Sequence, residues 1–229
     1  MDMVNMFFMN SPKVTKLLTL TFLIISLLAW FEVISSFNLY LNLSLVFKKF
    51  QIWRIFTSFL FFEEFGVSFL FHLILFYRYS NMLEKNVFRC SSPDYMYFLF
   101  LAFVVLLIIC PIAGIIRLSS SLSFTMMYYW GRKSKNTLVQ FIGIITIRAP
   151  YLPWLYLLAA VIFQSDIKND IIGIIAGHTI FFFKDIFPRI KEVKGKQILQ
   201  TPNIMKKICN KLNLNNEFVF DVDDGVLLF

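Results

Sequence analysis

Apolar stretches separated by short polar segments fill most of this chain. An α-helix needs about 20 mostly apolar residues to cross a bilayer. Six stretches predict six membrane helices, at residues 17–37, 59–79, 95–116, 118–130, 138–163 and 171–187. The pattern therefore predicts an all-α membrane protein built as a six-helix bundle.

Composition and charge agree with a membrane protein and exclude an ordinary soluble domain. The chain has 229 residues, 58% of them hydrophobic, and 29 are Phe. Its mean hydropathy is +0.70, and such a composition is typical of polytopic membrane proteins. The net charge of +8 fits an excess of Lys and Arg on the cytosolic side better than binding to nucleic acid.

The charge distribution also predicts topology and domains. Lys and Arg favour a cytosolic N-terminus and, with six spans, a cytosolic C-terminus. We expect a cytosolic segment at 1–16, one membrane domain at 17–188 and a flexible cytosolic tail at 189–229, where mixed charges give no reason for a packed domain. The first apolar stretch has no Ala-x-Ala-like exit, so it is expected to remain as the first helix.

The three cysteines are scattered and have no Cys-x-x-Cys spacing. The sequence therefore predicts no disulfide framework, no metal site and no cofactor.

An amphipathic segment lies between the first two stretches, at residues 47–56, where Phe and Ile are mixed with Lys and Arg. Such a composition is typical of a segment that lies in the membrane interface. Trp53 favours the headgroup level, and the planar guanidinium of Arg54 can bind a backbone carbonyl or a lipid phosphate. We expect this segment to disturb lipid order.

Polar residues weaken the second stretch. Glu63, Glu64 and His72 leave a short apolar run around residues 65–77. At about 1.5 Å per residue it covers about 20 Å, against a hydrocarbon core of about 30 Å. Either the membrane thins locally or the two glutamates reach the interface.

The fourth stretch is rich in hydroxyls, from Ser119, Ser120, Ser121, Ser123 and Thr125. Hydroxyls suit the interior of a bundle or a wet cavity better than a lipid-facing surface. This stretch is therefore predicted to form the central helix.

Gly173 and Gly177 lie on one face of the sixth predicted helix, where the absent side chains allow another helix to approach closely. The serine-rich helix is the expected neighbour. Taken alone, this spacing favours generic helix packing over a groove with a specific role.

A series of motifs in fixed order resembles the Derlin family. The resemblance covers about residues 11–202 and rests on Phe50-Gln51-Ile52-Trp53-Arg54, Phe69-Leu70-Phe71, Tyr77-Arg78-Tyr79, Leu83-Glu84, the segment 149–154, Gly173-x-x-x-Gly177-His178 and Asp185-Ile186-Phe187-Pro188. It implies a rhomboid-like pseudoprotease fold, with Trp53 and Arg54 in a membrane-surface loop between helices 1 and 2. It also implies a multi-pass protein of the endoplasmic reticulum that helps misfolded proteins reach cytosolic degradation.

An active rhomboid protease is the first alternative, and the residues argue against it. Active rhomboids resembling this fold have a Gly-x-Ser-Gly nucleophile turn, but the run from Ser119 to Ser123 contains no glycine. Asp170 stands where they have a histidine. His178 lies about two helical turns, or ~12 Å, further on, and is expected to make a packing hydrogen bond. No catalytic residue is predicted.

The sequence thus favours a non-catalytic dislocation factor with a polar lateral groove that binds misfolded substrates and thins the bilayer. The resemblance implies a membrane ubiquitin ligase complex and a cytosolic AAA ATPase as partners. The tail 217–229 has only Gly225 where direct ATPase binders have spaced glycines, so recruitment through another subunit is expected. A purely structural adaptor is the second alternative, and homo- and hetero-oligomers both remain open.

Overall fold

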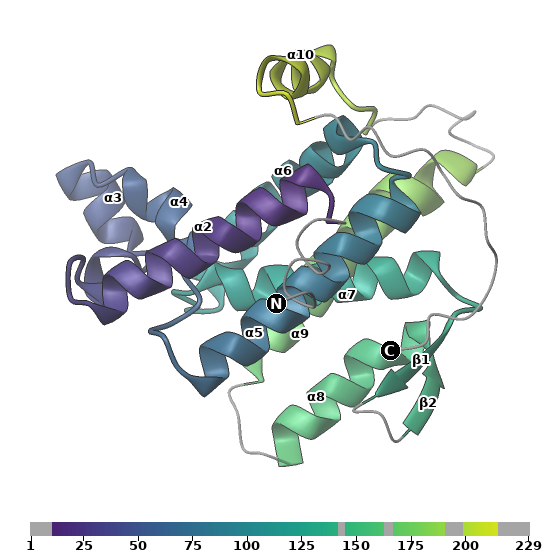
Figure 1. The fold of residues 1–229 in the computed structure, drawn as a ribbon, viewed down its shortest axis with the longest axis horizontal. Coiled ribbons are helices and arrows are strands. Elements are labelled where there is room, and N and C mark those ends of the chain that lie inside the picture. The colour runs from purple at the N-terminus through teal and green to yellow at the C-terminus, as the bar shows by residue number, and fades with distance from the viewer. Residues whose placement is uncertain (1–10, 142–144, 163–166, 191–198, 215–229) are drawn as a thin grey trace, which may run out of the picture.

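The computed structural model describes residues 11–141, 145–162, 167–190 and 199–214. Figure 1 shows a bundle of helices with two short strands beside it. The main helices of the bundle are α2 (Lys13–Trp30), α5 (Val67–Met82), α6 (Ser92–Ile112), α7 (Leu118–Lys133), α8 (Leu152–Ile162) and α9 (Lys168–Phe181). Shorter elements are η1 (Ser36–Asn38), α3 (Leu43–Lys49), α4 (Trp53–Leu60), η2 (Leu83–Val87), β1 (Leu138–Phe141), β2 (Ile145–Arg148), η3 (Ala149–Tyr151), η4 (Phe182–Ile186), η5 (Phe187–Arg189) and α10 (Asn203–Lys211).

Helix α7 is the centre of the bundle. Every residue from Leu118 to Gly131 is buried, and α7 packs against α5, α6, α8 and α9, most extensively against α9. The prediction that the serine-rich stretch forms the central helix is confirmed. The hydroxyls of Ser119, Ser121, Ser123 and Thr125 are tolerated there because they donate to backbone carbonyls of the bundle.

The expected fifth helix, residues 138–163, is wrong over its first half. Strands β1 and β2 form an antiparallel hairpin in which Leu138 pairs with Arg148, and helix α8 starts only at Leu152. The β-branched residues Ile145, Thr146 and Ile147 favour a strand, and Pro150 fits only the start of a helix. High hydropathy concealed this hairpin, and the expected end at residue 163 lies outside the described residues.

The second expected helix, 59–79, is divided in two. Helix α4 ends at Leu60, and α5 begins at Val67, with Glu63 and Glu64 in the non-helical segment between them. The first expected helix, 17–37, is shifted as well, since α2 begins at Lys13 and ends at Trp30. Phenylalanines follow the last residue of each helix, Phe31 after α2 and Phe61 after α4, so hydropathy alone does not locate these ends.

Three helical segments in the described part of the chain are long and apolar enough to cross a membrane: Lys13–Trp30, Ser92–Ile112 and Lys168–Arg189. The last continues from α9 through a π-helical turn, η4. The chain is therefore a mostly helical membrane protein, while the count of six spans stays a prediction.

Part of the expected flexible tail is folded. Helix α10 packs against α6, and Cys209 is fully buried with its Sγ 3.3 Å from Sδ of Met96. The hydroxyl of Ser92 donates to the carbonyl of Leu214 at 2.7 Å. The prediction of a tail without packing is wrong for residues 199–214, because α10 docks on α6 through Cys209, although Ile204 and Ile208 of the same helix are exposed. Residues 1–10, 191–198 and 215–229 lie outside the described part, and so do the expectations made for them.

The docking of α10 predicts slow reaction of Cys209 with maleimide. Burial, with a smaller contribution from the Glu84 carboxylate, raises the pKa of the Cys209 thiol, and only the thiolate reacts. Labelling in detergent should be at least tenfold slower than at the exposed thiol introduced by Lys207→Cys, as measured by mass spectrometry. It should accelerate as the pH rises, because the thiolate fraction increases. Equal rates would mean that α10 does not dock.

Candidate functional site

The amphipathic segment folds as two short helices, α3 and α4, that lie at one side of the bundle beside α2 (Figure 1). Asn42 caps α3 by accepting a hydrogen bond from the backbone N–H of Leu45 at 3.2 Å, as N-cap residues commonly do. Phe50 ends α3 in the left-handed conformation, with φ of 53°. The chain thus turns sharply before Trp53, where α4 begins.

The buried side chain of Arg54 connects two parts of this loop by hydrogen bonds. Its guanidinium donates to the carbonyls of Phe37 and Tyr40 at 2.6 and 3.1 Å. It also donates to the side-chain oxygens of Asn38 at 3.2 Å and Gln51 at 2.6 Å. The guanidinium therefore joins the loop after α2 to the start of α4. Of the two chemical roles considered for Arg54, this arrangement is that of a carbonyl-binding fork.

The outer face of the loop is apolar with basic residues between. Phe47, Phe50, Trp53 and Phe56 are each more than half exposed, and two lysines end α3. Exposed aromatic rings beside ammonium groups match the two layers of a membrane interface, hydrocarbon and headgroup. Trp53 is therefore placed to contact the surroundings of the loop, whereas Arg54 braces the loop from inside.

The serines of α7 are engaged inside the bundle. Ser119 donates to the Phe61 carbonyl at 2.7 Å, and Ser121 donates to the Asn169 carbonyl at 2.9 Å. Ser123 donates to the Ser119 carbonyl at 3.4 Å, and Ser120 is buried. The hydroxyls form a polar stripe in a packed interior, so the expected groove is not open along α7 in this structure.

Gly173 and Gly177 lie directly against α7. A Cβ atom on Gly173 would be 2.5 Å from the Ser121 carbonyl oxygen, and one on Gly177 would be 2.9 Å from the Thr125 carbonyl oxygen. The close approach also lets Thr125 donate to the Gly173 carbonyl at 3.0 Å. The two glycines and the serine-rich helix therefore form one interface.

His178 pairs with a tyrosine. Its Nδ1 atom lies 2.7 Å from the hydroxyl of Tyr128, as the expected packing hydrogen bond requires. Asp170, at the position where active rhomboids have histidine, is buried near the start of α9.

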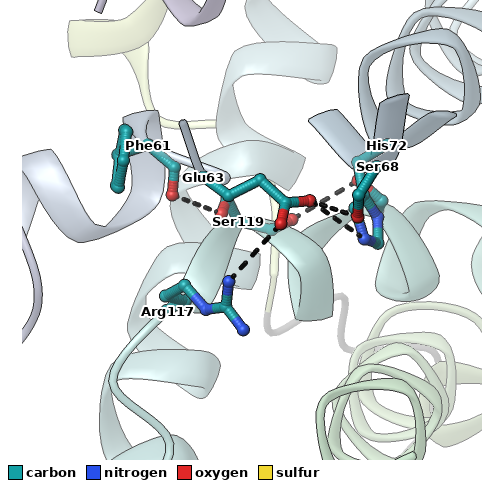
Figure 2. Close-up of polar contacts among 7 residues, drawn as sticks. Phe61, Glu63, Ser68, His72, Arg117 and Ser119 are labelled. Carbon is teal, nitrogen blue, oxygen red and sulfur yellow. Dashed lines mark hydrogen bonds and ion pairs between the residues drawn. The ribbon is translucent and has the colours of Figure 1, made fainter. Parts of the chain in front are cut away.

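A cluster around Glu63 was not predicted as a unit. Figure 2 shows the Glu63 carboxylate between Arg117, His72 and Ser68. It lies 3.9 Å from Nη1 of Arg117 and 3.9 Å from Nε2 of His72, and it accepts a 2.5 Å hydrogen bond from Ser68. The cluster connects the start of α5 to the loop before α7. Glu64 is bound separately, by the hydroxyl of Ser36 at 2.7 Å.

A second unpredicted network surrounds Glu84, which is fully buried. Its carboxylate accepts from the backbone N–H and the hydroxyl of Thr15 at 2.9 and 2.7 Å, near the start of α2. Thr15 also contacts Ser80 at 2.8 Å, and Ser80 contacts the Tyr95 hydroxyl at 2.5 Å. A carboxylate at a helix N-terminus is stabilised by the free N–H groups there.

In the described residues, no cluster of three or more His, Cys, Asp or Glu could hold a metal ion.

These features define a helical membrane protein with an amphipathic loop after its first helix and a glycine-to-serine helix interface at its centre. The sequence matches the model of the Der1-like family over residues 11–203. The chain belongs to this family.

Its relatives include the probable derlin-2 homolog of Dictyostelium discoideum, 33% identical over 88% of this chain and 81% of the relative. Derlin-2.1 of Arabidopsis thaliana is 37% identical over 77% of this chain and 76% of its own length. Derlin-1.1 of Zea mays is 31% identical over 91% of this chain and 85% of its own length.

Proposed function

We propose that this protein is a non-catalytic component of endoplasmic-reticulum-associated degradation that binds misfolded proteins and assists their retrotranslocation to the cytosol. Local thinning of the bilayer lowers the barrier to crossing, and so does a polar lateral groove that opens along the serines of α7 when a neighbouring helix moves away. Membership of the Der1-like family, generally involved in this degradation, supports the class of function.

The membrane-surface loop carries the proposal. Arg54 joins the segment after α2 to the start of α4 through four acceptors, and the braced loop presents exposed aromatic rings and lysines on its outer face. A rigid amphipathic wedge occupies the interface without filling the hydrocarbon core below it. Lipid tails under the wedge must shorten or tilt, which thins the membrane.

The charged ends of the second apolar stretch support the same mechanism. Only 13 residues separate Glu64 from Arg78, and at about 1.5 Å per residue they cover about 20 Å against a hydrocarbon core of about 30 Å. Each exposed polar backbone group costs several kcal/mol in hydrocarbon. Where the bilayer is thinner beside the polar stripe of α7, fewer backbone groups of a crossing substrate are exposed to hydrocarbon at the same time.

The contacts of the serines and of His178 favour a role without a chemical step. Ser119 donates to a carbonyl of the neighbouring chain segment, and His178 pairs with Tyr128. A serine nucleophile needs a base within hydrogen-bond reach, whereas these side chains have other partners. The function therefore consists of binding and membrane deformation.

The remaining parts of the proposal concern partners and location. We place the protein in the endoplasmic reticulum membrane with both termini cytosolic, beside a membrane ubiquitin ligase complex and a cytosolic AAA ATPase recruited through another subunit. Positive charge around α10 also suits contact with anionic lipids.

A translation-block chase of a misfolded lumenal glycoprotein tests the function. In cells lacking this chain the substrate should decay at least twofold more slowly, and wild type should restore the rate. A Phe47→Ala, Trp53→Ala variant should not, because it removes exposed rings of the wedge and spares the Arg54 bonds. The control Leu158→Ala, Val161→Ala removes exposed apolar surface from α8, which lies across the bundle from α3 and α4 (Figure 1), and should restore decay.

Protein levels of the variants are measured in parallel, so that loss of function is separated from loss of protein. Normal decay without the chain would refute the proposed role. A discrete substrate fragment that depends on wild type would indicate a protease.

A further inference from the structure

A basic cavity of about 910 Å³ lies between the bundle and the folded part of the tail. Phe88 and Arg89, from the loop after η2, line one part of it. Other parts are lined by the end of α7, by Lys184 of η4 and by the segment from Leu199 to α10. Figure 1 shows α10 at the end of the bundle where α6 begins. The docking of α10 against α6 thus completes the cavity.

Four cationic side chains from four different elements line this cavity. They are Arg89, Lys133 at the end of α7, Lys184 in η4, and Lys206 in α10. The carboxylate in the lining belongs to Asp94, which accepts hydrogen bonds from Ser91 and Thr201. Lys133 also pairs with Asp185. Positive charge therefore exceeds negative charge around the cavity.

Lys184 is the strongest indication of a ligand. Its ammonium group is buried and has no hydrogen-bond partner among the described residues. It lies 4.8 Å from the ring centre of Phe88 and 5.8 Å from that of Tyr97, contacts that favour a cation but satisfy none of its N–H donors. A buried ammonium is costly unless an anion with acceptor oxygens completes its surroundings.

The position of the cavity indicates a lipid. Helix α6 begins at Ser92, beside the lining residues, and the span that includes α9 passes through Lys184. The cavity therefore lies where these helices leave the membrane, on the side expected to be cytosolic. Basic pockets between helices at that level suit anionic headgroups. Its volume is within the range of small-molecule sites, and Gln200, Thr201 and Asn210 add polar atoms suited to a polyol.

We propose that this cavity binds the phosphorylated inositol headgroup of an anionic phospholipid. The phosphate accepts from Lys184 at the bottom and from Arg89 and Lys206 at the rim, while Phe88 and Tyr129 contact the ring carbons. Lipid bound there joins α10 to the bundle through charges of both parts. The inference does not depend on the dislocation function.

Binding is measured with the purified full chain in detergent, using dioctanoyl phosphatidylinositol 4-phosphate as the probe. Its affinity should exceed that of dioctanoyl phosphatidylcholine at least tenfold. Arg89→Gln with Lys206→Gln should weaken binding at least tenfold. The control Lys207→Gln with Lys211→Gln also removes two positive charges, both from α10 and both outside the cavity lining. It should change the lipid affinity less than twofold. Equal weakening by both pairs would indicate nonspecific attraction and refute the site.

Lys184→Met provides an independent measurement. It removes the ammonium and keeps an apolar stem against Phe88, so the ligand-free protein should keep its melting temperature while the lipid affinity falls at least tenfold. Unchanged affinity would refute the role of the cavity. Soluble inositol phosphate and inorganic phosphate are tested alongside. If either binds as tightly as the lipid, the site is one for a soluble anion and the lipid proposal is wrong.

Discussion

Replacing Arg54 with Ala should lower the free energy of unfolding by about 3 kcal/mol, because the buried guanidinium holds four acceptors from two parts of the loop. The carbonyls of Phe37 and Tyr40 lose their charged donor and have no equivalent partner to replace it. Unfolding by denaturant in detergent, followed by circular dichroism, measures the change. Arg54→Lys should recover less than half of it, because an ammonium cannot match the planar fork.

Trp53→Ala is the matched control for this prediction. Trp53 is adjacent to Arg54 but about half exposed, so its loss should change the free energy of unfolding by less than about 1 kcal/mol in detergent. The rate of substrate turnover should fall in both variants. The proposed function requires Trp53 to contact lipid and Arg54 to fix the backbone of the loop. If Arg54→Ala were as stable as Trp53→Ala, the bracing role would be wrong and Arg54 would act on lipid instead.

The sequence predicted the chemistry of this loop better than its geometry. Composition alone indicates an interfacial segment, and the guanidinium of Arg54 suggests a carbonyl or phosphate partner. The actual partners are the carbonyls of Phe37 and Tyr40 in the preceding loop. Phe37 is the last residue of the first apolar stretch, and Tyr40 lies just after it. No local pattern connects them, because the contact arises only when the chain turns back after α2.

The central interface was predictable because it depends on local periodicity. Gly173 and Gly177 are four residues apart, so they share a helix face, and hydroxyl-rich α7 is suited to a buried position. The Glu63 and Glu84 networks depend instead on side chains distant in sequence, such as Arg117 and Thr15. Pairing of that kind follows from the tertiary fold.

Hydropathy gave a wrong prediction of secondary structure where apolar residues form a structure other than a membrane helix. Residues 138–148 are apolar enough to suggest part of a span, yet residues 138–141 and 145–148 pair as antiparallel strands. For the tail the prediction was wrong in the opposite direction, because a charged composition concealed the docking of α10 through the buried Cys209. In β1 the alternate burial of Val139 and Phe141 is more informative than the number of apolar residues.

Gly173→Ala should destabilise the protein by about 2–3 kcal/mol, because the added methyl would overlap the backbone of α7. The new Cβ would lie 2.5 Å from the Ser121 carbonyl oxygen and 2.6 Å from Cβ of Phe124. Neither atom can rotate away, so α9 must move from α7 and weaken the bond from Thr125 to the Gly173 carbonyl. Denaturant unfolding of the purified chain in detergent measures the loss.

Gly177→Ala should cost less, about 1–2 kcal/mol, because its Cβ would be 2.9 Å from the nearest backbone atom, the Thr125 carbonyl oxygen. Gly66→Ala is the control. A Cβ there would meet its nearest atom at 3.9 Å, and the extended backbone of Gly66, with φ of −175°, accepts any residue, so the change should stay within about 0.5 kcal/mol. If Gly173→Ala matched Gly66→Ala, the tight contact between α7 and α9 would be wrong. If Gly173→Ala slowed substrate decay at an unchanged protein level, the α7–α9 interface would have a role in dislocation beyond packing, because stability alone acts through abundance.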